Sequence, residues 1–173
     1  VLAAFAFFIV GVCLKLALFP LHLWLPNAYA YAPSVVTAFL AATATKVSIY
    51  VLYRFVFTIF GQSFSFDVIP LESILLVLSL AGIFAASIVA IFQTNVKRLL
   101  AYSSVAQIGY IMLGVALVSV AGLTASILHI FNHAIMKGAL FLCMGAVYYQ
   151  IGSVKIEDMN GIGKKMPFTM FAF

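Results

Sequence analysis

The stretch that decides the fold is KLALFPLHLWLPNAYAYAPSVVTAFLAATATKVSIYVLYR, residues 15–54. Its first half holds three prolines, Pro20, Pro26 and Pro33. Proline lacks a backbone donor and restricts the residue before it, so residues 20–33 cannot form one regular helix. We therefore expect a broken helix with a short re-entrant or interfacial piece, followed by a long apolar helix.

Composition places the chain in the membrane. Of its 173 residues, 66% are hydrophobic and 8% are charged, whereas soluble domains carry roughly 25% charged residues. The net charge of +5 does not indicate a nucleic-acid partner, because the basic residues lie inside apolar runs or at their ends. No phosphate loop, nucleophile triad or cofactor fingerprint is present. Cys13 and Cys143 lie in apolar segments and are expected to be packed thiols.

Long apolar runs predict an all-α membrane protein, a polytopic bundle of transmembrane helices. A spanning helix needs ~20 mostly apolar residues. The expected spans are 1–19, 34–58, 71–93, 99–119 and 122–149, with a sixth beginning near Pro167. The fifth is longer than a span requires, so it tilts, kinks or extends beyond the bilayer. The chain starts without methionine or a signal-peptide pattern and ends in an apolar run, so we expect an internal piece of a longer subunit.

Charge in the connections predicts the orientation. Lysine and arginine gather in two connections, 94–98 and 150–166, and the connections of the other side carry none. Basic loops face the cytoplasm, so we expect both connections, and with them the proline break, on the cytoplasmic side. Arg54, near the outer end of its span, counts against this orientation. Lys97 and Arg98 are expected to be interfacial anchors without a transport role.

Three lysines, Lys15, Lys46 and Lys137, lie deep in apolar runs, and no acidic residue lies at comparable depth. A charged group there costs on the order of 2.5–3.5 kcal/mol, and such residues usually face a polar interior or pathway. Lys46 lies too far from either helix end to reach the interface, so it is either held by carbonyl groups or relays protons. Burial favours the neutral amine, which makes proton exchange practical. Lys15 either extends to the cytoplasmic interface or is solvated by carbonyls that the break frees.

A second group of ionisable residues is His129, His133 and Lys137 in LHIFNHAIMKGALF. Spacings of four residues place them on one helix face, rising ~6 Å per step. Histidine titrates near physiological pH, so the three resemble one side of a proton wire. Two alternatives stay open: zinc binding, for which no Glu or Cys completes a site, and plain packing of the imidazoles.

Four further residues are candidates for access or hydration. Ser103, Gln107 and Tyr110 follow helical spacing and can hydrate an interior face, although polar residues also join membrane helices. His22 lies in the proline break and can accept protons near its mouth. Trp24, in the same segment, fits an interfacial aromatic.

These stretches, together with NVKRLLAYSSVAQIGY (95–110) and FNHAIMKGALFLCMGAVYYQIG (131–152), resemble the antiporter-type subunits shared by complex I, membrane-bound hydrogenases and Mrp-type cation/proton antiporters. The spacing and the closing GIGKKMPFTM run are most similar to the D-type member of the Mrp antiporter subunits. The resemblance implies a bundle built from inverted repeats, of which this chain covers roughly one. It also implies that Lys15 is the broken-helix lysine and Lys46 the central lysine, and that a glutamate partner of Lys15 lies outside this chain.

The resulting hypothesis is a proton-translocating membrane subunit of a multisubunit Na⁺/proton antiporter, in a bacterial or archaeal cell membrane. Lys15, Lys46, His129, His133 and Lys137 would relay protons, and the chain would hold no cofactor or metal of its own. One alternative is the equivalent subunit of a respiratory NADH:quinone oxidoreductase or hydrogenase, driven by electron transfer in other subunits. Another is a structural membrane scaffold whose lysines only hold helices together.

Overall fold

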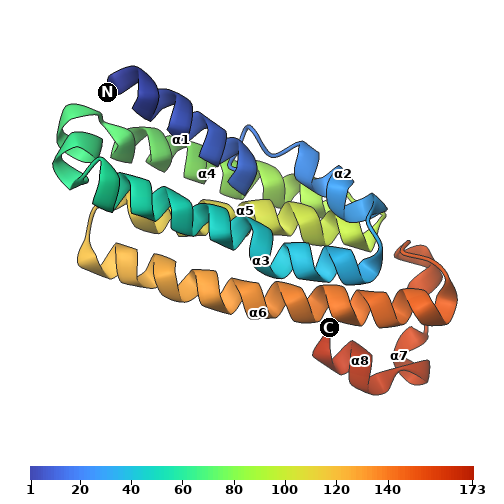
Figure 1. Cartoon of the computed structure of the whole chain (residues 1–173). Coiled ribbons are helices and arrows are strands. Elements are labelled where there is room, and N and C mark those ends of the chain that lie inside the picture. The colour runs from blue at the N-terminus through green and yellow to red at the C-terminus, as the bar shows by residue number, and fades with distance from the viewer.

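The computed structural model describes residues 1–173 and is helical almost throughout, without a β-sheet. The long helices lie side by side in one elongated bundle (Figure 1), which confirms the predicted all-α bundle. The helices are α1 (Leu2–Leu16), α2 (Trp24–Tyr31), α3 (Ser34–Tyr53), α4 (Leu71–Ile91), α5 (Val96–Ala116), α6 (Val120–Ile151), α7 (Ile162–Lys165) and α8 (Pro167–Ala172), with π-helical segments at Arg54–Ile59 and Ser63–Val68 and a 3₁₀ turn at Glu157–Met159.

The first helix breaks earlier than the proline pattern alone indicates. α1 ends at Leu16 because Ala17 takes the left-handed conformation, with φ 62°, so the helix stops short of the expected residue 19. The chain resumes helix at Trp24 and leaves it at Ala32, which is extended ahead of Pro33, as the residue before a proline prefers. α2 is therefore the short piece predicted for residues 20–33.

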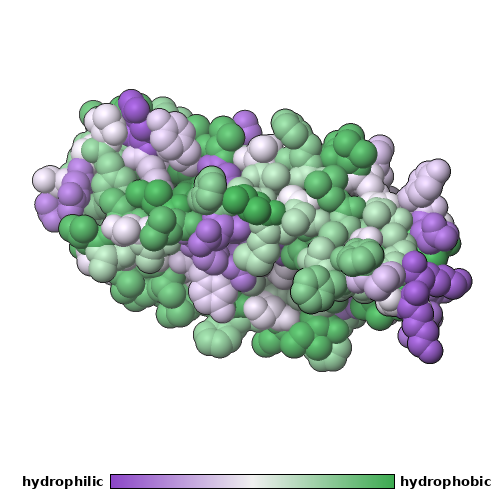
Figure 2. All heavy atoms as spheres, turned by 90° about the horizontal axis from the view of Figure 1, so that it is seen from below, coloured by the Kyte–Doolittle hydropathy of each residue, from purple (hydrophilic) through white to green (hydrophobic).

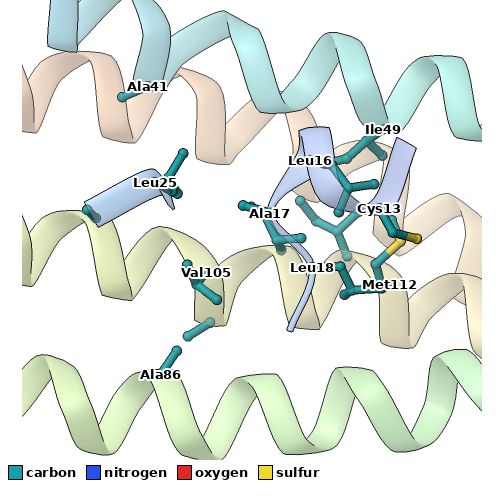
Figure 3. Packing of buried hydrophobic residues seen from close by; sticks show 14 of the residues in the cluster. Cys13, Leu16, Ala17, Leu18, Leu25, Ala41, Ile49, Ala86, Val105 and Met112 are labelled. Carbon is teal, nitrogen blue, oxygen red and sulfur yellow. The ribbon is translucent and has the colours of Figure 1, made fainter. Parts of the chain in front are cut away.

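Part of the irregular backbone between α1 and α2 is covered by protein. Ala17 and Leu18 are buried, and Figure 3 shows them next to Val105 and Met112 of α5. Backbone without regular hydrogen bonds is tolerated at membrane depth only where protein or a cavity covers it. Packing against α5 thus makes the break compatible with a membrane bundle.

Capping side chains set the starts of α5 and α6. The Asn95 side chain accepts a hydrogen bond from the backbone N–H of Arg98 (3.2 Å), and that of Ser119 accepts one from Gly122 (3.1 Å). Such caps satisfy donors that the first turn of a helix leaves free. The helices therefore begin at 96 and 120, a few residues before the starts that hydrophobicity indicates.

α5 is the central helix, packed against α4, α6 and α2, while α3 packs against α6 and α1. Four helical segments are long and apolar enough to cross a membrane: Ser34–Ile59, α4, α5 and α6. Figure 2 shows a largely hydrophobic face, with hydrophilic residues at both ends and in one patch near the middle. At 32 residues α6 is ~48 Å long, more than a ~30 Å hydrocarbon core requires.

The two basic connections lie together at one end of the bundle, near α7 (Figure 1). The backbone N–H of Val96 donates to the carbonyl of Val154 (2.9 Å), and that of Ile156 donates to Thr94 (3.0 Å). These bonds hold the α4–α5 connection against the segment that follows α6. The positive charges of both connections therefore belong to a single face of the molecule.

The close approach of α6 leaves no room for a side chain at Gly114, near the end of α5. A Cβ there would lie 2.7 Å from the carbonyl oxygen of Gly122 and 2.9 Å from Cβ of Ser126. Gly114→Ala is expected to separate the helices and to destabilise the full-length subunit by about 1–3 kcal/mol. A thermal melt in detergent measures this. Gly11→Ala is the control, because no atom lies within 4 Å of its Cβ position; equal melting of the two variants would contradict the packing described.

Candidate functional site

The polar residues of α6 form a line inside the bundle. His133 and Lys137 are 0% and 3% exposed, and His129 is half-buried. The imidazole rings of His129 and His133 stack with 6.1 Å between centroids and 18° between planes. The i, i+4 spacing therefore produces the shared face that the sequence predicts.

Lys137 is tied to α5 by its ammonium group. Its Nζ donates to the carbonyl of Leu100 (2.9 Å) and to the hydroxyl of Ser103. A buried amine without acceptors is costly, and these two satisfy part of its donor capacity. Ser103, a predicted hydration residue, is thus a direct partner of Lys137.

Lys46 lies on α3 and is 6% exposed. Its Nζ donates to the carbonyl of Ala41 on its own helix. That bond leaves further donor capacity, because an ammonium group has three N–H donors.

The pairing of α3 with α6 places Lys46 level with His133. The two helices are antiparallel, and their closest contacts include Ser34 with Gly145, Ala42 with Gly138 and Tyr53 with Ser126. The register that these contacts set brings Lys46 opposite His133. The charges of Lys46 and Lys137 repel each other, and both act on His133. Three ionisable groups from two helices therefore meet in the bundle interior.

His133 has no hydrogen-bond partner on either ring nitrogen, although the residue is fully buried. Buried polar atoms normally have partners, so an unpaired imidazole near two lysines is unusual for a purely structural residue. A neutral imidazole has one nitrogen that accepts a proton and one that donates. The position suits a group that passes protons between the two amines.

His129 extends the line toward the connection between α5 and α6. Its Nε2 lies 2.6 Å from Oε1 of Gln107, so the ring N–H donates to the amide oxygen. The ring of Tyr110 lies 6.4 Å from that of His129, edge-on. The structure thus brings Gln107 and Tyr110 to the histidine line. No group of three or more His, Cys, Asp or Glu side chains that could hold a metal ion is present.

Lys15 and His22 lie apart from this cluster. Lys15 is exposed on the last turn of α1, where the indole N–H of Trp24 donates to the neighbouring carbonyl of Leu14 (2.9 Å) and ties α2 to α1. His22 is buried and packs on Phe19 and Tyr102, with ring centroids at 5.3 Å and 6.2 Å. The described contacts do not connect either residue to Lys46.

Two polar residues on these faces are absent from the sequence-based candidates. The hydroxyl of Tyr53 lies 2.5 Å from Oγ of Ser126, which in turn donates to the carbonyl of Ile111 (2.6 Å). Helical spacing could have identified both, because Ser126 precedes His129 by three residues and Tyr53 follows Lys46 by seven.

Lys97, expected to be an interfacial anchor, is buried against neighbouring helices. It is 6% exposed, donates to the carbonyl of Ala32 (3.0 Å) and lies 5.8 Å above the ring centre of Tyr148. Tight packing of α5 against α2 encloses its side chain.

Lys97→Met is expected to destabilise the full-length subunit by about 1–3 kcal/mol, because the carbonyl of Ala32 loses a charged donor and keeps only the hydroxyl of Thr37. Thermal melting measures the change. Lys155→Met, at an exposed position, is the control. A Lys97 variant as stable as the control would show that this contact contributes nothing.

Comparison with known proteins identifies the family. The family model for the NADH:quinone oxidoreductase/Mrp antiporter membrane region matches residues 1–173. NADH-quinone oxidoreductase subunit N of Desulforudis audaxviator is 47% identical over 173 residues, which are 100% of this chain and 34% of the relative. The chain spans about a third of the length of the curated relatives it matches.

Two solved structures share the fold. In the Mrp complex from Dietzia sp. DQ12-45-1b, the similar chain has a TM-score of 0.85 and 33% identity, over 92% of this chain and 29% of that one. In the membrane-bound sulfane sulfur reductase, an archaeal respiratory membrane complex, it has a TM-score of 0.80 and 32% identity, over 94% and 33%. Both redox-complex and Mrp relatives are thus similar to this chain, and the specific likeness to the D-type member of the Mrp subunits stays a prediction. The chain belongs to the NADH:quinone oxidoreductase/Mrp antiporter family of multi-pass membrane proteins.

Proposed function

We propose that this chain is the proton-relaying part of a membrane subunit in a multisubunit complex. The observation that carries the proposal is the group formed by Lys46, His133 and Lys137, buried together inside an apolar bundle. Ionisable residues in such a place are costly and typically mark an ion pathway. His129 and Gln107 continue the group toward one end of the bundle.

Electrostatic coupling between the two lysines explains how this group could move protons. Lys46 and Lys137 repel each other, so a proton taken up by one amine raises the free energy of protonating the other. His133 lies near both lysines with both ring nitrogens unpaired, which suits it to accept a proton from one amine and donate it to the other. A partner subunit that shifts the charge near Lys46 would thereby drive protons along the line.

The energy source is the second part of the proposal. The 47% identity to an NADH-quinone oxidoreductase subunit over the whole chain supports a parent driven by electron transfer in other subunits. The likeness to the Mrp complex supports the second candidate, a parent that exchanges Na⁺ for protons. The relaying residues of this chain are the same in either parent complex.

Orientation follows from the basic end of the bundle. The basic stretches 94–98 and 150–166 share one face, and basic connections favour the cytoplasmic side. We therefore place this face in the cytoplasm of a bacterial or archaeal cell, with the α5–α6 turn on the opposite side.

The test is proton flux into proteoliposomes that contain the full complex with its full-length subunit. Either NADH with quinone or a Na⁺ gradient supplies the energy. Flux that depends on one of these two energy sources and is lost in Lys46→Ala supports both the relay and the corresponding parent complex. A complex that assembles but moves no protons with either energy source would contradict the relay and support the scaffold alternative.

A further inference from the structure

An arginine that the proposed relay does not use lies at the far end of α3. Arg54 directly follows the last residue of α3 and is exposed. α3 has 20 residues and is therefore ~30 Å long, which equals the thickness of a typical hydrocarbon core. α3 begins at the end of the bundle that carries the basic connections, where Lys97 contacts Ala32 (Figure 1). Arg54 therefore lies at the opposite membrane interface.

The guanidinium of Arg54 has no anionic partner in this chain. Its one hydrogen bond goes to the hydroxyl of Tyr50, at 3.5 Å, and a guanidinium has five N–H donors. Phospholipid headgroups lie at the depth of Arg54, just outside the hydrocarbon core. A guanidinium donates two parallel hydrogen bonds to a phosphate, which is the geometry that arginine fits best. A lipid phosphate would thus satisfy donors that the protein leaves free.

An apolar hollow lies beside Arg54, between α3 and α6. Its volume is about 450 Å³. The lining residues are all hydrophobic: Tyr50, Tyr53, Ile127, Ile130, Phe131 and Ala134. Tyr50 and Phe131 are 57% and 66% exposed, so the hollow opens to the side of the bundle. Water needs polar partners to occupy a cavity, so hydrocarbon fits this hollow better than water.

The hollow extends from the level of Arg54 toward the middle of the bundle. The hydroxyl of Tyr53 is hydrogen-bonded to Ser126, which places Ile127 of α6 beside the end of α3. Ala134 lies seven residues farther along α6, or ~10 Å closer to the basic end. A charged group at the interface is therefore followed by an apolar hollow directly below it.

We propose that Arg54 and this hollow bind one anionic phospholipid, from the leaflet opposite the basic connections. The lipid phosphate accepts hydrogen bonds from the guanidinium, and one acyl chain lies in the hollow along Ile130 and Phe131. An anionic headgroup fits better than a zwitterionic one, because no second cation competes for its phosphate. A helix from the rest of the subunit would fill the hollow and still leave Arg54 without an anion, unless it carried a carboxylate at the same level.

Photolabelling of the full complex in lipid vesicles, with its full-length subunit, tests the site. The probes are phosphatidylglycerol and phosphatidylcholine that carry the same diazirine-labelled acyl chain and differ only in the headgroup. Mass spectrometry of peptides locates and quantifies the label on the segments of α3 and α6 that line the hollow. Arg54→Gln removes the charge. Lys155→Gln removes a charge from an exposed position at the basic end and is the matched control.

Phosphatidylglycerol should label the hollow about fivefold more than phosphatidylcholine, which is the preference that one basic residue gives near an anionic headgroup. Arg54→Gln should abolish this preference, and Lys155→Gln should retain it. Equal labelling by the two lipids in the wild-type complex, or a preference that survives in Arg54→Gln, would overturn the proposal. Absence of label from both lipids would also overturn it, because another helix would then cover the hollow. The wild-type comparison decides the matter even if Arg54→Gln fails to assemble.

Discussion

Lys46→Ala is expected to lower proton flux through the assembled complex by about 100-fold, as when a proton-transfer group is lost. Lys46 is the one buried ionisable residue that α3 contributes to the cluster. Alanine at this position leaves His133 without a proton partner on that side. The complex should still assemble, because the lost amine bonds only to its own helix, at Ala41.

Flux is measured by a pH-sensitive dye inside proteoliposomes and is normalised to the amount of complex. Lys164→Ala removes a lysine from an exposed position and is the matched control; its flux should equal that of the wild type. Wild-type flux in Lys46→Ala would remove Lys46 from the relay.

Lys137→Met is expected to lower proton flux by about tenfold or more. The substitution keeps much of the side-chain volume and removes the ammonium group that α5 holds through Leu100 and Ser103. Ser103→Ala should have a smaller effect, because the carbonyl of Leu100 still accepts from Lys137.

The matched control lies on the same helix. Asn132→Ala changes an exposed polar residue of α6, and its flux should stay at the wild-type level. A loss of assembly in Lys137→Met, with normal flux from the complexes that remain, would support the scaffold alternative and contradict a relay role for this lysine.

The sequence predicts the helices and the polar line on α6 because both depend only on residues that are close to one another in the sequence. Apolar runs of about 20 residues need only their length to indicate a helix, and the proline cluster indicates the break. His129, His133 and Lys137 share a face because residues four apart in a helix lie one above the other. Helix ends were less predictable, since single capping side chains such as Ser119 move them by a few residues.

The meeting of Lys46 with His133 could not be predicted from the sequence. It depends on the register of α3 against α6, which close contacts such as Ala42 with Gly138 determine. The burial of Lys97 likewise depends on how α2 packs against α5. Local periodicity contains no information on either arrangement.

Lys46→Arg tests the central claim, that a buried lysine gains and loses a proton during transport. Arginine keeps a positive charge and does not release its proton in proteins, so it can replace a lysine that only supplies charge or hydrogen bonds. The measurement is proton flux per assembled complex in proteoliposomes. A relay predicts flux as low as that of Lys46→Ala; flux near the wild-type level in Lys46→Arg would contradict the account.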